Sequence, residues 1–441
     1  MGLQAVDLAI CASWIIPVIP TNRCFEECAI VVNKGTITAI VPQAELHSRF
    51  QPTDVVALPG QVLIPGLINA HGHAAMALMR GFADDYPLMT WLEKHIWPAE
   101  GRFVSEEFVR DGTELAIAEM LSSGTTCFSD MYFFPEVAAE VAHECGIRAQ
   151  LAFPVLDFPT VWGRGPDDYF DKGLKLHDRY RSHDRIRVAF GPHAPYTVSD
   201  PVLSRIVTYA EELQAPVQIH LHETAHEVSE SEKNLGMRPS QRLAQLGLLS
   251  PLTQCVHVTQ CNDDDLDLFS QYGVSIVHCP DSNLKLASGL APISRMLAAG
   301  VNVALGTDGA ASNNDLNLLA ECQQAALLAK YQSGNAASVT AEQALAMATI
   351  NGAIALGIED QVGSLEVGKA ADICAIDLNG LHHQPLHSPL SQVVYGNASR
   401  DVSNVWVKGR QLVKDRALTS LNTARIRQRA HYWREHMHHV D

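Results

Sequence analysis

The sequence lacks the cysteine pattern of a small disulfide-stabilised protein. It has ten cysteines, none of which forms a C-x-x-C pair, and they are scattered through apolar segments. Low-complexity tracts are also absent, and hydrophobic residues make up 47% of the chain, which is enough for a large core. We therefore expect an ordered globular protein with reduced thiols and a cytoplasmic location.

Long apolar runs are missing as well. No stretch is long and apolar enough to span a bilayer, so we expect no membrane partner. The apolar run 8–20 is similar to part of a signal peptide. However, Asp7 precedes it, no basic residue leads into it, and Pro17 and Pro20 interrupt it. We interpret this run as a β-strand.

Positive charge is scarce. The chain has 32 Lys and Arg residues against 49 Asp and Glu residues, which gives a formal net charge of -17. This charge would repel DNA and RNA, so nucleic acid is excluded as a bulk partner. A neutral or zwitterionic small molecule is compatible with it.

The middle of the 441-residue chain alternates between two patterns. Short β-branched runs are followed by helical patterns such as 105–121 and 201–213, which is typical of parallel βαβ units. The pattern favours an α/β fold with a TIM-type (β/α)8 barrel. An open doubly wound sheet is the alternative, although six strands would be more usual there. The eight predicted strands are 62–73, 124–130, 147–155, 186–193, 217–222, 254–258, 274–279 and 301–308.

The two ends of the chain have a different pattern. Residues 1–60 and 362–441 show short strands and turns, with strands expected at 28–32, 36–41, 372–377, 402–408 and 411–413. We predict a small β-sandwich domain built from both termini, with the barrel of residues 61–361 inserted between its two parts. A polar helix is expected at 425–437.

Side chains that bind metals or transfer protons gather where the predicted barrel strands end. Active sites of (β/α)8 barrels form at the C-terminal ends of the strands. Residues placed by chance would not occur at this one end of the barrel so consistently. In chain order these residues are His71 and His73, His193, His220 with Glu223 just beyond it, His257, and Asp308.

His71-Gly72-His73 is the strongest local signal. Residues i and i+2 of a strand point to the same face, so both imidazoles are predicted to face the barrel interior. Together with His220 and Asp308 they make a ligand set suited to zinc, with an open position for a water that the metal would acidify. The alternative is a set of hydrogen-bonded core histidines, which the same-face spacing disfavours.

Glu223 follows His220 by three residues and lies past the predicted strand, where it can lean over the pocket. A carboxylate beside a metal-activated water is what a proton shuttle requires. The alternative is a carboxylate that stabilises the start of the next helix through the helix dipole.

These residues resemble the amidohydrolase superfamily in its single-metal subtype, and the resemblance covers nearly the whole chain. Two-metal barrels of this kind commonly use a modified lysine at the end of strand four. Here that strand ends in Gly191-Pro192-His193, so the resemblance implies one metal ion per subunit. The motifs are PGLINAHGH at 65–73, His220 with Glu223, His257, GTDG at 306–309 and GKAADI at 368–373.

Within that superfamily the chain looks most like the 5-methylthioadenosine/S-adenosylhomocysteine deaminases. The resemblance implies a zinc-dependent aminohydrolase that converts 5'-substituted adenosines, with adenosine as a further candidate, to inosine analogues and ammonia. The segments that carry it are MRG at 79–81, Trp91-Leu92, PAE at 98–100, GPHAPY at 191–196 and NLKLASG at 283–289.

The resemblance also implies roles for individual residues. Glu100 would bind the ribose hydroxyls, Trp91 would line the pocket, and His193 would contact the substrate near the ribose and base. Arg164 is a candidate partner for the homocysteine carboxylate, with a solvated loop cation as the alternative. The catalytic residues would be Asp308, which takes a proton from the attacking water, Glu223, which protonates ring N1, and His257, which hydrogen-bonds the attacking oxygen.

Two other functions stay open. One is an amidohydrolase that acts on a free base or related heterocycle, of the guanine or triazine type, although the intact Glu223 favours deamination. The other is a non-catalytic ligand-binding barrel, which would bind no metal. The sequence neither ranks the adenosine substrates nor decides between Zn2+ and Fe2+. A homo-oligomer is expected, but the sequence does not determine the oligomeric state.

Overall fold

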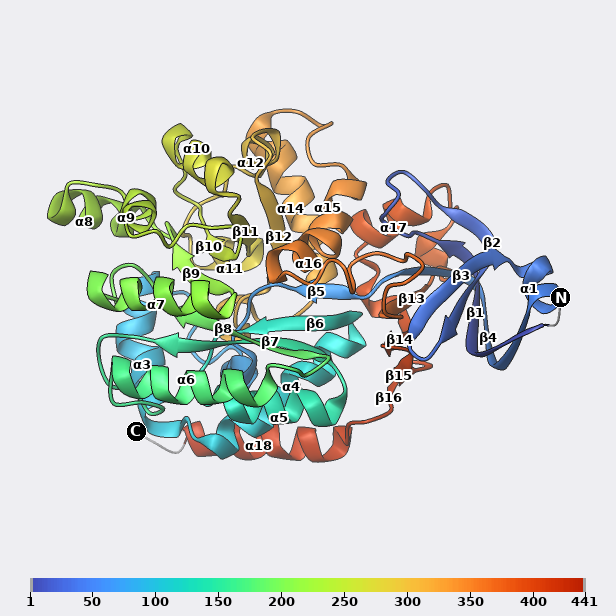
Figure 1. Cartoon of the computed structure of the whole chain (residues 1–441), viewed down its shortest axis with the longest axis horizontal. Coiled ribbons are helices and arrows are strands. Elements are labelled where there is room, and N and C mark those ends of the chain that lie inside the picture. Colours follow the sequence, from blue (N-terminus) through green and yellow to red (C-terminus); the bar gives the residue numbers. More distant parts are fainter. Residues whose placement is uncertain (1–2, 439–441) are drawn as a thin grey trace.

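The computed structural model describes residues 3–438, so the first two and the last three residues of the predicted terminal segments lie outside the described part of the chain. Two sheets organise the molecule (Figure 1). One is an eight-stranded parallel sheet surrounded by helices, and the other is an eight-stranded mixed sheet at one end of the molecule. Within residues 3–438, no helix combines the length and apolarity needed to cross a membrane.

The parallel sheet is the barrel that the sequence predicts. Its strands are hydrogen-bonded in chain order from β5 to β12. The two edges meet where the backbone N–H of Ala70, just after β5, donates to the carbonyl oxygen of Leu305 in β12 at 2.9 Å. The predicted (β/α)8 fold is therefore confirmed. The strands are β5 (Leu67–Asn69), β6 (Thr125–Asp130), β7 (Arg148–Val155), β8 (Ile186–Pro192), β9 (Val217–Leu221), β10 (Thr253–His257), β11 (Ser275–His278) and β12 (Asn302–Leu305).

The first barrel strand is much shorter than the predicted range 62–73. Residues up to Pro65 belong to β4 (Phe50–Pro65) of the mixed sheet, and the chain changes sheets at Gly66. Pro65 cannot donate a ladder hydrogen bond, and a Cβ at Gly66 would lie 2.1 Å from Oγ1 of Thr126. His71 and His73 therefore lie in the loop after β5, and their placement within a strand was wrong. The other predicted strands agree with the structure to within a few residues.

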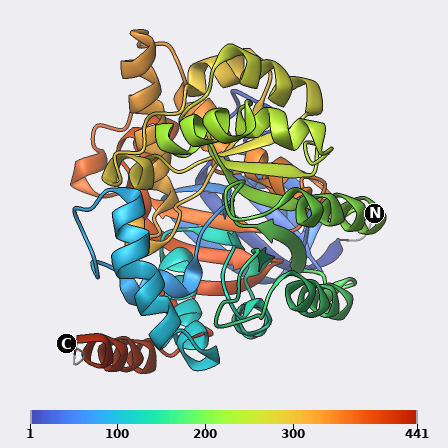
Figure 2. The same cartoon turned by 90° about the vertical axis from the view of Figure 1, so that its left-hand side faces the viewer.

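Helices surround the barrel strands, as Figure 2 shows from the end of the molecule opposite the mixed sheet. Ser105 caps α4, because its hydroxyl accepts a hydrogen bond from the backbone N–H of Phe108 at 3.2 Å, and Thr224 caps α8 in the same way. The barrel helices are α4 (Glu106–Ser122), α5 (Pro135–Cys145), α6 (Pro166–Tyr180), α7 (Asp200–Leu213), α8 (Ala225–Leu235), α9 (Pro239–Gln245), α10 (Asp263–Tyr272), α11 (Pro280–Lys285), α12 (Ile293–Ala298), α13 (Ala310–Asn313), α14 (Leu318–Ser333), α15 (Ala341–Met347) and α16 (Ile350–Leu356).

A run of short helices follows β5 and precedes α4. Its apolar side chains are largely buried, so this segment packs over the C-terminal ends of the barrel strands instead of extending into solvent. The elements are η1 (Ala74–Met79), α2 (Leu88–Trp91), η2 (Leu92–Ile96) and α3 (Trp97–Phe103).

The mixed sheet is built from both ends of the chain, as predicted. Its N-terminal and C-terminal parts join where β4 pairs antiparallel with β13, for example at Ile64 and Cys374. The strand order is β16-β15-β14-β13-β4-β1-β2-β3, and β1 ends at Ile15, earlier than the predicted 8–20. The elements are β1 (Gln4–Ile15), β2 (Phe25–Asn33), β3 (Thr36–Pro42), α1 (Gln43–Arg49), β4, β13 (Ile373–Asp377), η3 (Leu381–His383), α17 (Pro389–Tyr395), η4 (Ala398–Asp401), β14 (Val402–Val407), β15 (Arg410–Lys414) and β16 (Ala417–Leu418).

The predicted C-terminal helix is α18 (Thr423–His438), which packs along α4 (Figure 1). Trp433 inserts between the two helices, and its indole N–H donates to Asp111 at 2.8 Å. Arg429 donates to the same carboxylate, and Arg425 pairs with Glu114. The tail is therefore attached to the barrel by one buried aromatic side chain and several ion pairs.

Candidate metal centre and active site

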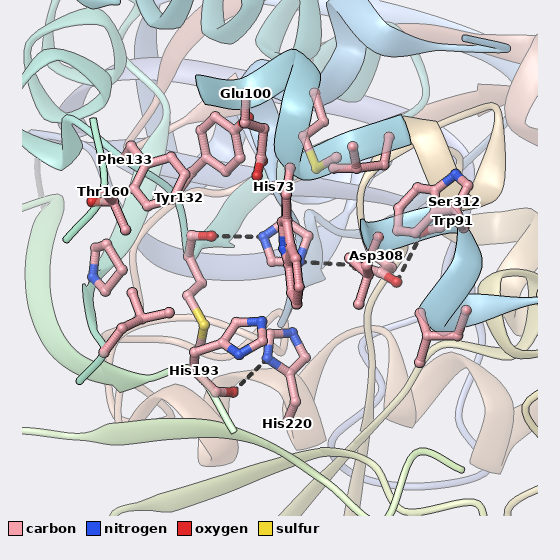
Figure 3. Close-up of a pocket in the computed structure, with 18 of the residues that line it drawn as sticks. His73, Trp91, Glu100, Tyr132, Phe133, Thr160, His193, His220, Asp308 and Ser312 are labelled. Atoms are coloured by element: carbon pink, nitrogen blue, oxygen red, sulfur yellow. Dashed lines mark hydrogen bonds and ion pairs between the residues drawn. The ribbon is translucent and has the colours of Figure 1, made fainter. Parts of the chain in front are cut away.

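Four of the residues that the sequence singles out lie together at the C-terminal ends of the barrel strands. Figure 3 shows three of them, His73, His220 and Asp308. Nε2 of His73 lies 3.2 Å from Oδ1 of Asp308, and Nε2 of His71 lies 3.5 Å from the same oxygen. Nε2 of His220, in β9, lies 3.3 Å from Nε2 of His71. The structure thus brings the three imidazoles and the carboxylate around one point.

Backbone contacts hold the two loop histidines at this point. The backbone N–H of Asp308 donates to the carbonyl oxygen of His71 at 3.2 Å, and that of Met131 donates to Gly72 at 3.0 Å. A Cβ at Gly306 would lie within 2.8 Å of the His71 backbone, so only glycine permits this approach. The loops after β5, β6 and β12 therefore position one another.

The hydrogen bonds of the three imidazoles define their protonation. Nδ1 of His71 faces Oε1 of Gln218 at 2.8 Å, Nδ1 of His73 faces the carbonyl oxygen of Met131 at 2.6 Å, and Nδ1 of His220 faces that of His193 at 2.7 Å. Because these oxygens only accept, each Nδ1 carries a proton, and the neutral form of each ring presents its lone pair at Nε2.

This arrangement fits a metal ion. The Nε2 atoms of His71 and His220 lie 3.3 Å apart with their lone pairs toward each other, and Oδ1 of Asp308 lies beside them. The two nitrogens and this oxygen would repel one another unless a cation lay among them. Three nitrogen donors and one carboxylate oxygen are a typical ligand set for a catalytic transition metal.

The Asp308 carboxylate is oriented by residues that the sequence analysis missed. Its Oδ2 lies 2.6 Å from the hydroxyl of Ser282 and 2.9 Å from that of Ser312, while its Oδ1 accepts from the backbone N–H of Gly309 at 2.8 Å. The hydroxyls hold Oδ2 away from the histidines, which leaves Oδ1 facing them. Both serines follow the ends of barrel strands, a position that could have identified them.

Glu223 lies just beyond β9 at the edge of this cluster. Its side chain is 10% exposed, and Oε2 is 3.8 Å from Nε2 of His257. Burial, together with the nearby charge of Asp308, raises the pKa of Glu223 to about 8. Its backbone N–H donates to the carboxyl of Glu227 at 2.8 Å, which holds the turn between β9 and α8. A buried carboxyl with a raised pKa is suited to proton transfer near neutral pH.

His257, at the end of β10, lies beside the cluster. One of its ring nitrogens lies within 4.8 Å of one nitrogen of His71 and one of His220. The side-chain amide of Asn283 donates to its Nδ1 at 3.0 Å, so the proton of the neutral ring is on Nε2. Burial lowers the pKa of His257 to about 4, which keeps the ring neutral. His257 is thus a hydrogen-bond donor toward the cluster.

A cavity of about 260 Å³ extends from the cluster toward solvent. Trp91 of α2, Glu100 of α3 and His193, which follows β8, all line it (Figure 3). Burial raises the pKa of Glu100 to about 7 and lowers that of His193 to about 4. Tyr132, which the sequence analysis missed, lines the same wall, and its hydroxyl adjoins Glu100.

Arg164 does not join this group. Its side chain is 92% exposed, its Nε lies 3.6 Å from Asp168, and it does not line the cavity. The neighbouring Trp162 is 3% exposed and directs its indole N–H to Glu136. Trp162 thus points inward while Arg164 faces solvent, and this geometry gives no support to a contact between Arg164 and the substrate.

Comparison with known proteins assigns the chain to a family. The model of the amidohydrolase family matches residues 62–412, which is most of the chain. This protein belongs to the amidohydrolase family. It is also 57% identical to the 5-methylthioadenosine/S-adenosylhomocysteine deaminase of Teredinibacter turnerae, over 98% of this chain and 97% of the relative.

Two further relatives of this amidohydrolase are similar over nearly their whole length. The 5-methylthioadenosine/S-adenosylhomocysteine deaminase of Saccharophagus degradans is 56% identical over 97% of this chain and 96% of the relative. The crystal structure of an adenosine deaminase from Xanthomonas campestris with bound zinc has a TM-score of 0.98 and 45% identity, and covers 100% of both chains. These comparisons support a metal site in this amidohydrolase.

Proposed function

We propose that this amidohydrolase is a metal-dependent deaminase that converts 5'-substituted adenosines and water into inosine analogues and ammonia. The observation that carries the proposal is the buried carboxyl of Glu223, placed beside a cluster of metal-type ligands in a cavity that also holds Glu100. The relatives from Teredinibacter and Saccharophagus, named as deaminases of 5-methylthioadenosine and S-adenosylhomocysteine, support the same substrates here.

The proposed metal is zinc, with one ion per subunit held by His71, His73, His220 and Asp308, although Fe2+ accepts similar ligands. When bound, the metal supplies the Lewis acidity that makes water a nucleophile at neutral pH. The zinc in the Xanthomonas structure supports this choice.

The side chains of this amidohydrolase supply the proton transfers. Asp308 accepts a proton from the water that attacks C6 of the adenine ring. Glu223 donates a proton to N1, so that the ring accepts the electron pair as the new C–O bond forms. The Nε2–H of His257 donates a hydrogen bond to the added oxygen. Glu223 then takes the proton of the added hydroxyl, and Asp308 or Glu223 passes a proton to the amino group, which leaves as ammonia as the C–N bond breaks and the C6 carbonyl forms.

Substitution of Asn283 tests the role of His257. In Asn283→Ala the ring loses the donor to its Nδ1 and is free to adopt the other tautomer, which has no proton on Nε2. We expect kcat for adenosine analogues to fall about tenfold, the effect of one hydrogen bond, while KM and metal content stay unchanged. Steady-state kinetics and the nitrogen NMR shifts of His257 measure the two effects. Asn234→Ala, in the exposed part of α8, is the control, and unchanged nitrogen shifts in Asn283→Ala would contradict this role.

Substitution of Glu100 separates nucleosides from free bases. In the proposed complex the Glu100 carboxylate accepts hydrogen bonds from the ribose hydroxyls. We expect Glu100→Ala to lower kcat/KM for adenosine analogues about 10–100-fold, the effect of hydrogen bonds to a charged group, and to leave free-base turnover unchanged. Glu93→Ala, an exposed carboxylate on η2, is the matched control. Equal losses for bases and nucleosides would instead favour a guanine-type deaminase.

The pH dependence offers a second test of Glu100. Burial raises its pKa to about 7, so the carboxylate becomes protonated as the pH falls below that value and accepts hydrogen bonds less well. We expect kcat/KM for adenosine analogues to decrease on the acidic side of about pH 7. Comparison of the pH profiles of the wild type and Glu100→Gln isolates this contribution, and identical profiles would show that Glu100 does not cause the decrease.

The location that we propose is the cytoplasm. All ten cysteines carry free thiols, and most of them are buried in the core. Free buried thiols are typical of proteins that fold in a reducing compartment. A nucleoside formed inside the cell would be accessible to the enzyme there.

A further inference from the structure

The outer part of the cavity is apolar and partly exposed to solvent. Four of its lining side chains are large, hydrophobic and between 37% and 48% exposed: Trp97, Phe158, Val161 and Tyr196. A lining residue with this exposure lies where the cavity meets solvent, so these residues form the mouth. An apolar group bound at the mouth would remove this surface from water, which is favourable.

Apart from its histidines, the cavity is lined by acidic side chains and not, in the described part of the chain, by lysine or arginine. Among the described residues 3–438, no lysine or arginine lines it, whereas Glu100, Glu223 and Asp308 do. The metal would offset the charge of Asp308 at the inner end of the cavity, where that carboxylate is a proposed ligand. A substrate carboxylate at the mouth would therefore find no fixed cation and would lose part of its hydration.

Three cations on the segments that adjoin Val161 and Tyr196 are engaged elsewhere. Arg164 faces solvent beside Asp168, and Lys172 interacts with the same carboxylate and with the carbonyl oxygen of Trp162. Arg242 is held by Asp200 and by two backbone carbonyl oxygens. None of these three side chains lines the cavity, so the mouth holds no preformed site for an amino-acid carboxylate.

From these observations we propose that the enzyme selects adenosines with an uncharged, apolar 5' substituent, such as an alkylthio group, over those with an amino-acid substituent. This inference rests on the proposed function, because the ribose must bind at Glu100 for the 5' position to face the mouth. 5'-Methylthioadenosine places a methylthio group against Phe158 and Val161. S-Adenosylhomocysteine instead places a zwitterionic amino-acid group there, and both its ammonium and its carboxylate would lose hydration against the apolar side chains. The specificity-determining residues are thus those of the mouth.

The test compares kcat/KM of the metal-loaded enzyme for 5'-methylthioadenosine and S-adenosylhomocysteine under the same conditions. We expect a ratio of about 100-fold in favour of 5'-methylthioadenosine, comparable to the loss of one or more hydrogen bonds to a charged group. A ratio near one would overturn the inference while leaving the deaminase function intact. Failure to deaminate any nucleoside would instead contradict the proposed function.

Variants at the mouth test the physical cause. Val161→Arg introduces a cation, and we expect it to raise kcat/KM for S-adenosylhomocysteine relative to 5'-methylthioadenosine by about tenfold, whereas the neutral control Val161→Gln should not. The same ratio is then measured for Arg164→Ala. A selective loss of S-adenosylhomocysteine turnover in this variant would show that Arg164 reaches the substrate, and would overturn the inference.

Discussion

Glu223→Gln is expected to lower kcat for adenosine analogues by about 10²–10⁴-fold, the usual contribution of a positioned proton-transfer group. Glutamine has the same size and still forms hydrogen bonds, but it cannot donate a proton to N1 of the ring. Because the Glu223 side chain is only 10% exposed, water has little access to replace it. The absorbance change from adenine to hypoxanthine measures turnover directly, and KM should change much less than kcat.

Two further measurements make this prediction specific. Metal content should equal that of the wild type, because Glu223 is not among the proposed ligands. Glu230→Gln makes the same chemical change on the exposed side of α8, where the carboxylate pairs with Lys233, and should retain full activity. Near wild-type turnover in Glu223→Gln would show that another group protonates the ring, and the proposed mechanism would then be wrong.

Removal of the metal is the second prediction with a large expected effect. Without a cation, the lone pairs of His71 and His220 face each other at 3.3 Å beside the Asp308 carboxylate. We expect a chelator to lower kcat by about 10³-fold or more, because water loses the Lewis acid that activates it. Thermal stability should fall too, since binding at a concentration 100 times Kd stabilises a folded protein by about 2.7 kcal/mol.

Metal restoration identifies the ion. Zn2+ or Fe2+ added to the chelated protein should recover both activity and thermal stability, and elemental analysis of the purified protein shows which metal it carries. His220→Ala should lose metal and activity together, whereas His226→Ala, an exposed imidazole on α8, should lose neither. Full turnover by a protein shown to be metal-free would exclude the proposed centre and favour another chemistry for the cavity.

The barrel was predictable because its signal is local. The alternation of β-branched runs with helical patterns predicts each strand and each helix from its own residues. Seven of the eight strands lie close to their expected positions. The same pattern predicts where each strand ends. The histidines and carboxylates that follow the strands could therefore be assigned to the C-terminal end of the barrel. The first strand was misplaced because β4 and β5 are both apolar and only the turn at Gly66 separates the two sheets.

The sequence by itself determined the barrel, the small β domain and the group of residues around the candidate metal centre. Only the tertiary structure decided how His71 and His73 meet Asp308 from a loop, which serines orient that carboxylate, and that Arg164 faces solvent while the mouth is apolar. The physical reason is that the spacing of hydrophobic residues predicts each strand or helix separately, without its contacts to the others. Contacts between side chains on different loops depend on how the barrel closes and on which neighbour, such as Trp162, occupies the interior.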